Sequence, residues 1–153
     1  MKRTYMLVML SVMVWGCANL DTQYFSREKP DEADLVGVYR ATPETLAWVR
    51  EDGGYQVDEI TITLGADGKA VIDNLPDWHR TGFGDPTAEH VLDHIEESWE
   101  IRKSQSWWYL HIPGTWINIV GQEPPYDLWI YVGDPDSGDV MIFERVDDAS
   151  DSQ

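Results

Sequence analysis

Two histidines and a glutamate stand at a spacing that suits a metal ion. His90 and His94 are four residues apart, and Glu97 follows one turn later if 86–97 is a helix. An Asp-Pro pair at the start of this segment predicts a capped helix N-terminus. Two imidazoles and one carboxylate on one helix face could then converge on zinc or a similar ion. The alternative is a solvated face on which the histidines pair with neighbouring acids.

A second group of acids lies in the loop that contains Asp134, Asp136 and Asp139. Aspartates at alternate positions are found in calcium loops, although the spacing here departs from the EF-hand pattern. The same residues also suit a tight turn, because proline fixes φ and glycine accepts a left-handed backbone. The chain has no Gly-x-Ser-x-Gly motif and no glycine-rich phosphate loop. We therefore expect no cofactor and no enzymatic activity.

Four aromatic residues are the candidate contacts for a ligand or partner: Trp107, Tyr109, Trp129 and Tyr131. They alternate with aliphatic residues in segments that read as strands, so both faces of this sheet region are predicted to be apolar. The second face must be covered or must bind something. We expect the 86–97 helix to cover it, or part of it to line a cleft. Trp107 and Trp108 should point to opposite faces because they are adjacent.

The last hairpin has the same two-sided apolar character. We expect Leu128 and Ile130 to lie opposite Val140 and Ile142 on one face of the hairpin. On the other face we expect Trp129 and Tyr131 to lie opposite Met141 and Phe143.

Short runs rich in Val, Ile, Thr, Trp and Tyr, separated by Gly, Pro and Asp, dominate the rest of the chain. They predict strands near 35–42, 56–64, 69–74, 98–104, 106–112, 117–121, 127–132 and 140–146. Thr42-Pro43 begins either a short helix or a further strand. We predict an all-β fold, a single small antiparallel meander barrel of about eight strands with one short packed helix.

The chain begins with Lys2 and Arg3, an apolar run of about a dozen residues, and then Gly16-Cys17. That run is shorter than the roughly 20 residues of a membrane-spanning helix. The segment resembles a bacterial lipoprotein signal, with Trp15 as a departure from the usual pattern. The resemblance implies cleavage after residue 16, lipidation of Cys17, and an anchor in the outer membrane facing the periplasm, since Ala18 is not acidic.

Composition sets the domain plan and excludes some partners. We expect a signal peptide over 1–16, a lipidated cysteine and flexible tether over 17–34, a barrel domain over 35–146, and a disordered acidic tail over 147–153. The net charge is −17, and loss of Lys2 and Arg3 with the leader makes it −19. Such a charge disfavours nucleic acid and anionic lipid surfaces as partners of the folded domain.

Gly37, Tyr39 and Arg145 resemble the closing device of lipocalin-like barrels, in which an aromatic residue near the first strand packs against an arginine from the end of the barrel. Tyrosine here replaces the tryptophan that lipocalins favour. An arginine over a tyrosine face would give a cation–π contact; pairing with a surface carboxylate is the alternative. The turn sequences around Asp67-Gly68 and 133–138 are also similar to those of small bacterial proteins without assigned function.

These observations predict a non-catalytic envelope lipoprotein that acts as a protein-interaction or structural module. Its partners would be the membrane, through the lipid on Cys17, and another envelope protein. The alternative is a lipocalin-like carrier of a small hydrophobic ligand, and a weaker alternative is a metal protein or enzyme that uses His90 and His94. A filled barrel interior favours the first hypothesis, and an empty one favours the carrier.

Overall fold

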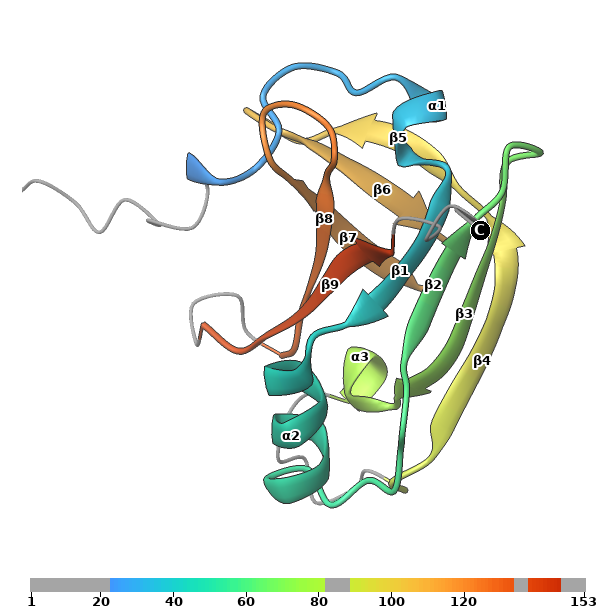
Figure 1. Ribbon diagram of the computed structural model, residues 1–153, viewed down its shortest axis with the longest axis vertical. Helices are drawn as coiled ribbons and strands as arrows, with labels where there is room; N and C mark the ends of the chain where they lie inside the picture. Colours follow the sequence, from blue (N-terminus) through green and yellow to red (C-terminus); the bar gives the residue numbers. More distant parts are fainter. Residues whose placement is uncertain (1–22, 82–88, 134–137, 147–153) are drawn as a thin grey trace, which may run out of the picture.

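The computed structural model describes residues 23–81, 89–133 and 138–146. This part of the chain is all-β, with nine antiparallel strands and three short helices (Figure 1). The helices are α1 (Glu32–Leu35), α2 (Pro43–Glu51) and α3 (Trp78–Thr81). The strands are β1 (Gly37–Ala41), β2 (Thr61–Leu64), β3 (Lys69–Pro76), β4 (Leu92–Ser98), β5 (Glu100–Lys103), β6 (Trp108–Ile112), β7 (Thr115–Val120), β8 (Asp127–Tyr131) and β9 (Val140–Val146).

The strands form one curled sheet in the order β4-β3-β2-β1-β9-β8-β7-β6-β5. The first and last strands of the chain, β1 and β9, are therefore neighbours inside the sheet. Its two edge strands, β4 and β5, are consecutive in the sequence and separated only by Trp99. Curling brings the two edges to one corner, where Trp99 N donates to Gly68 O at 2.9 Å and its indole nitrogen donates to Gly65 O at 3.2 Å. The described sheet is barrel-like.

Each of the eight predicted segments overlaps a strand, and the ninth strand is β4. The predicted 86–97 helix is wrong over its described residues, 89–97, because Leu92–Ser98 forms strand β4 and pairs with β3. Residues 86–88 lie outside the described part of the chain. A bulge between Ile72 and Leu75 shifts the register of this pairing. Leu92 and Ile95, three residues apart, are both partly buried against the core. Their spacing matched the helical period, but pairing with β3 decided the structure.

The segment that begins at Thr42-Pro43 forms helix α2, so the first of the two predicted alternatives is correct and the additional strand is not formed. Thr42 caps it, because its Oγ1 accepts the backbone N–H of Thr45 at 3.2 Å. Thr45 Oγ1 in turn accepts the N–H of Ile142 at 3.0 Å, which attaches the helix to β9.

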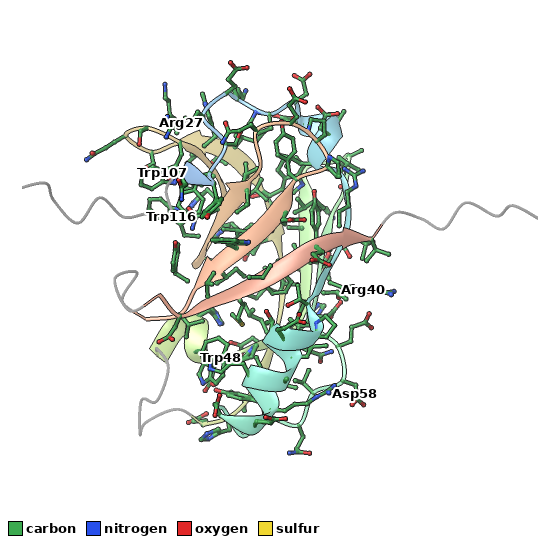
Figure 2. The ribbon with its side chains drawn as sticks, turned by 60° about the vertical axis from the view of Figure 1, so that its left-hand side comes forward. Arg27, Arg40, Trp48, Asp58, Trp107 and Trp116 are labelled. Atoms are coloured by element: carbon green, nitrogen blue, oxygen red, sulfur yellow. The ribbon has the colours of Figure 1, made fainter. Side chains whose placement is uncertain are left out.

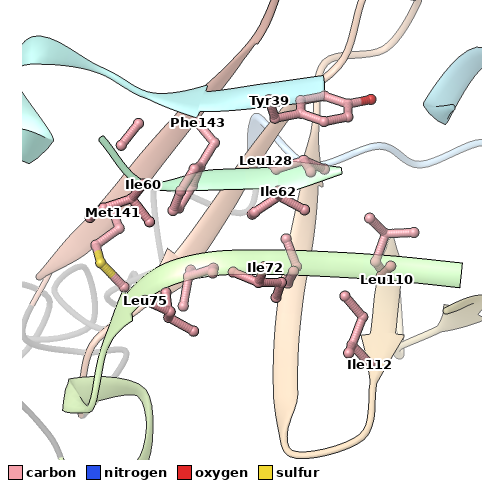
Figure 3. Packing of buried hydrophobic residues seen from close by; sticks show 14 of the residues in the cluster. Tyr39, Ile60, Ile62, Ile72, Leu75, Leu110, Ile112, Leu128, Met141 and Phe143 are labelled. Carbon is pink, nitrogen blue, oxygen red and sulfur yellow. The ribbon is translucent and has the colours of Figure 1, made fainter. Parts of the chain in front are cut away.

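The interior of the sheet is filled by its own side chains. Leu110, Ile112 and Leu128 are completely buried, and Ile130 is 2 % exposed, all within one hydrophobic cluster. Figure 3 shows side chains of β1, β2, β3, β6, β8 and β9 packed in this core. The interior is therefore a packed core in the described part of the chain.

The predicted register of the last hairpin is wrong by one residue. Leu128 lies opposite Phe143 and Ile130 opposite Met141, so all four face the core, whereas Trp129 lies opposite Ile142 on the outer face. The sequence contained the correct two faces of each strand but matched them incorrectly, because a shift of one residue exchanges faces.

Candidate recognition site

The outer face of β6, β7 and β8 gathers the aromatic residues predicted as contacts. Tyr109 lies opposite Asn118, and Asn118 lies opposite Trp129 on the next strand. Tyr131 follows Trp129 on the same face, opposite Val140. The buried residues of these strands alternate with them and point inward. The structure thus brings the predicted aromatic residues onto one face.

The N-terminal segment covers part of this face, in the role that we had predicted for the 86–97 helix. Ser26 N donates to Ile119 O and Ser26 O accepts from Trp108 N, both at 2.9 Å. Phe25 forms an antiparallel bridge with Val120 and is only 2 % exposed. The segment therefore hydrogen-bonds to β6 and β7 where the pairing between these strands ends. The described part of the predicted tether, 23–34, belongs to the folded domain.

Phe25 is the centre of an aromatic cluster. Its ring centroid lies 5.6 Å from that of Trp107, 6.2 Å from that of Trp129 and 6.3 Å from that of Tyr131. The neighbouring Tyr24 also packs on Trp129, with the two ring centroids 6.0 Å apart, and its side chain is 51 % exposed. These contacts fix the aromatic side chains of the outer face, so the surface is organised before any partner arrives.

A pocket of about 620 Å³ opens beside this cluster. Four aromatic side chains line it: Phe25, Trp107, Trp116 and Tyr131. Trp116 is 50 % exposed and stacks on Tyr109, with the ring centroids 4.1 Å apart and the planes 18° apart. Figure 2 shows Trp107 and Trp116 on one side of the molecule, away from Arg40 and Asp58. The volume lies in the range of small-molecule sites.

The polar lining of the pocket consists of His79, His111, Thr115 and Asn118. The Asn118 oxygen accepts the indole N–H of Trp107 at 3.2 Å. Thr115 is 8 % exposed, and its buried hydroxyl has no hydrogen-bond partner among the described residues. Buried polar atoms are nearly always paired, so an unpaired one needs an explanation. Trp116, His111 and Thr115 were missed by the sequence analysis because they fall at or beside the turn between two predicted strands.

His79 has a structural role. Its Nδ1 lies 3.0 Å from Pro76 O, and its Nε2 lies 3.6 Å from a carboxylate oxygen of Asp93. Asp93 also accepts two hydrogen bonds from Arg80, at 2.9 and 3.0 Å. Both imidazole nitrogens of His79 therefore lie close to protein oxygens, although the residue is part of the pocket lining.

The predicted metal ligands do not converge. His90 precedes β4 with a left-handed φ of 55°, and its ring packs 5.2 Å from that of Tyr55. His94 Nδ1 lies 2.6 Å from a carboxylate oxygen of Asp73, which belongs to the neighbouring strand β3. His94 and Glu97 are three residues apart on a strand, so they point to opposite faces. Among the described residues no group of three His, Cys, Asp or Glu side chains could hold a metal ion. Of the predicted acidic loop, Asp134 and Asp136 lie outside the described residues.

Gly37, Tyr39 and Arg145 do come together, by contacts other than those expected. Tyr39 and Arg145 are partners in the β1–β9 register, and Tyr39 is fully buried with its hydroxyl donating to Leu35 O at 2.9 Å. The Arg145 guanidinium donates to the backbone oxygens of Asp34 and Val36. A Cβ at Gly37 would stand 3.3 Å from Arg145 Nε. Arg145 thus ties the last strand to the α1 segment through carbonyls. Among the described residues its guanidinium forms neither the predicted ion pair with a carboxylate nor the predicted cation–π contact with Tyr39.

The electrostatics at this junction follow from burial. Burial raises the pKa of Tyr39 to about 12, although the neighbouring Arg145 guanidinium acts in the opposite direction. Burial also raises the pKa of Asp127, and the nearby Glu144 carboxylate adds to the effect. Neither residue lines the aromatic pocket, so the perturbed groups belong to the fold.

Cys17 lies outside the described residues, and no helix within them is long and apolar enough to span a bilayer. We compared the chain with protein-family models, with curated proteins and with solved structures, and none of these comparisons gave a match.

Proposed function

We propose that the protein is a non-catalytic envelope lipoprotein, anchored through a lipid on Cys17 in the outer membrane and facing the periplasm. In this proposal the folded domain is a recognition module that binds a partner through the outer aromatic face of β6, β7 and β8. The proposal combines the lipoprotein-like leader with the surface described above.

One contrast carries the proposal: the interior is filled, while the aromatic side chains gather around a pocket on the outside. Leu110, Ile112 and Leu128 are fully buried in the core, which leaves the interior occupied by the protein itself. Trp116 is half exposed on a rigid stack. Exposed aromatic residues on a preorganised surface are typical of recognition sites.

The lipocalin-like architecture is part of this proposal. It is supported by the adjacency of β1 and β9, and by the meeting of Gly37, Tyr39 and Arg145. A barrel of this type holds its ligand inside, and here the interior is packed. The fold would then serve as a scaffold for an external site.

The carrier hypothesis remains as a second candidate because of the 620 Å³ pocket. A carrier would hold its ligand in this outer pocket. The alternative that used His90 and His94 as ligands has lost its geometric basis, since the two side chains have different partners.

One variant and one cross-linking pair test the proposal in the full chain. We expect Cys17→Ser to move the protein from the membrane to the soluble fraction and to abolish a lipid mass on the N-terminal peptide. A photoreactive residue at position 116 should cross-link to a partner in intact cells, whereas one at position 58, on the opposite side, should not. Unchanged membrane association of Cys17→Ser, or equal cross-linking from both positions, would contradict the proposal.

A further inference from the structure

We infer that the aromatic pocket binds an uncharged sugar ring, as part of a neutral glycan. This inference deepens the proposed function and rests on it for the biological setting, because it names the class of partner that the outer face would recognise. Its chemical basis is the pocket alone.

The lining of the pocket excludes charged ligands. One quarter of the chain is charged, yet none of the described residues that line the pocket is Asp, Glu, Lys or Arg. A charged group that entered would lose its water without gaining an ion partner. The net charge of −17 adds a long-range repulsion against anionic ligands.

The polar groups of the pocket argue against a purely apolar ligand. The amide oxygen of Asn118 is taken by Trp107, which leaves the amide nitrogen as a donor. His111 adds an imidazole to the same lining. An acyl chain would leave these groups unpaired, and unpaired groups reduce affinity.

The aromatic walls supply the other half of a sugar site. A pyranose ring presents C–H bonds on its faces and hydroxyl groups around its rim. Trp116 offers a flat, half-exposed surface, and its stack on Tyr109 holds it in place. The ring of a sugar can lie on this surface while its hydroxyl groups exchange hydrogen bonds with Asn118 and His111, which line the same pocket. A neutral pocket with both features fits an uncharged sugar better than a lipid or an ion.

The test is a titration of the full-length protein, in a detergent whose headgroup contains no sugar. The probes are two neutral oligosaccharides, cellohexaose and chitohexaose, one anionic oligosaccharide of galacturonic acid, and the apolar dye Nile red. Calorimetry gives the affinity, and tryptophan fluorescence reports on the pocket. We expect at least one neutral oligosaccharide to bind, and neither the anionic oligosaccharide nor the dye to compete with it.

Three variants assign the binding to the pocket. Trp116→Ala should weaken it by about tenfold or more, because the stacking surface is lost. Tyr24→Ala is the matched control: Tyr24 is 51 % exposed and packs on an aromatic ring of the same face, but it does not line the pocket. His111→Phe should weaken binding by about fivefold, the equivalent of one hydrogen bond.

His111→Phe also separates a binding role from a structural one. Phenylalanine keeps a ring of similar size at this partly buried position, so the melting temperature should stay unchanged. Weaker sugar binding together with undiminished stability supports the inference. It is overturned if no neutral oligosaccharide binds at millimolar concentration, if Nile red binds and His111→Phe binds it more tightly, or if Trp116→Ala and Tyr24→Ala behave alike. Lipidation of Cys17 is measured separately, so loss of the anchor and loss of the sugar site are distinguishable.

Discussion

Replacing Phe25 by alanine tests whether the N-terminal segment is part of the domain. Phe25 is 98 % buried, since its exposed fraction is 2 %, and its ring contacts three aromatic rings. A buried aromatic side chain removes roughly 150–250 Å² from water, which corresponds to about 4–6 kcal/mol at about 25 cal/mol per Å². The methyl group of alanine retains part of this, so we expect a loss of about 3 kcal/mol in the free energy of unfolding.

The assay is urea unfolding of the full chain, followed by circular dichroism and by tryptophan fluorescence. In Phe25→Ala the native fluorescence should also shift to longer wavelength, because Trp107 and Trp129 lose their cover. Tyr24→Ala serves as the control, and we expect it to cost less than about 1 kcal/mol because half of its side chain is already exposed. Equal midpoints for the two variants would refute the reasoning, since they would mean that residues 24–26 are a detached tether.

Three further predictions concern the fold. Gly53→Ala should lower the free energy of unfolding by about 3 kcal/mol, because its Cβ would stand 2.0 Å from a ring atom of Trp78; thermal unfolding checks this, and a stability equal to wild type would contradict it. Arg145→Leu should cost about 2 kcal/mol, because it leaves two carbonyls of the α1 segment without their donor; Arg145→Lys should recover only part of that loss in the same unfolding assay. Burial raises the pKa of Tyr39 from 10.0 to about 12, so the unfolded chain releases this phenol proton at lower pH than the folded chain does. The free energy of unfolding should therefore fall as the pH rises from 10.0 to about 12. Tyr39→Phe should flatten that fall, and an equally steep fall in the variant would assign it to other groups.

The strands could be predicted because their side chains carry the signal locally. Runs of β-branched and aromatic residues bounded by Gly, Pro and Asp located eight of the nine strands. The start of α2 was also readable, since a threonine cap and a first-turn proline act within one turn.

The strand β4 could not be predicted, because its apolar residues fall by coincidence at helical spacing. Leu92 and Ile95 satisfy a helix in the sequence, yet both lie on the edge strand β4 and are partly buried against the core. Only the partner strand decides between the two structures, and the partner is distant in sequence. The metal hypothesis for His90, His94 and Glu97 depended on that helix and failed with it.

The candidate site was predictable in part. The outer-facing Trp107 and Tyr131 follow from alternation along their strands. Phe25 does not, because a three-residue segment has no period and its contacts with β6 and β7 are long-range. Trp116 lies just after a Pro-Gly turn, where the sequence gives no clear strand boundary.

The central claim is that recognition takes place in the outer aromatic pocket and leaves the barrel interior closed. The most direct measurement is nuclear magnetic resonance of the indole N–H and methyl groups while the protein is titrated with the neutral oligosaccharide, cellohexaose or chitohexaose, that binds in the calorimetric assay. We expect the indole signals of Trp107 and Trp116 to move, while those of the buried Trp78 and Trp99 and the methyl signals of the core residue Leu110 stay in place. Shifts confined to the core signals, with Trp116 unchanged, would contradict the account.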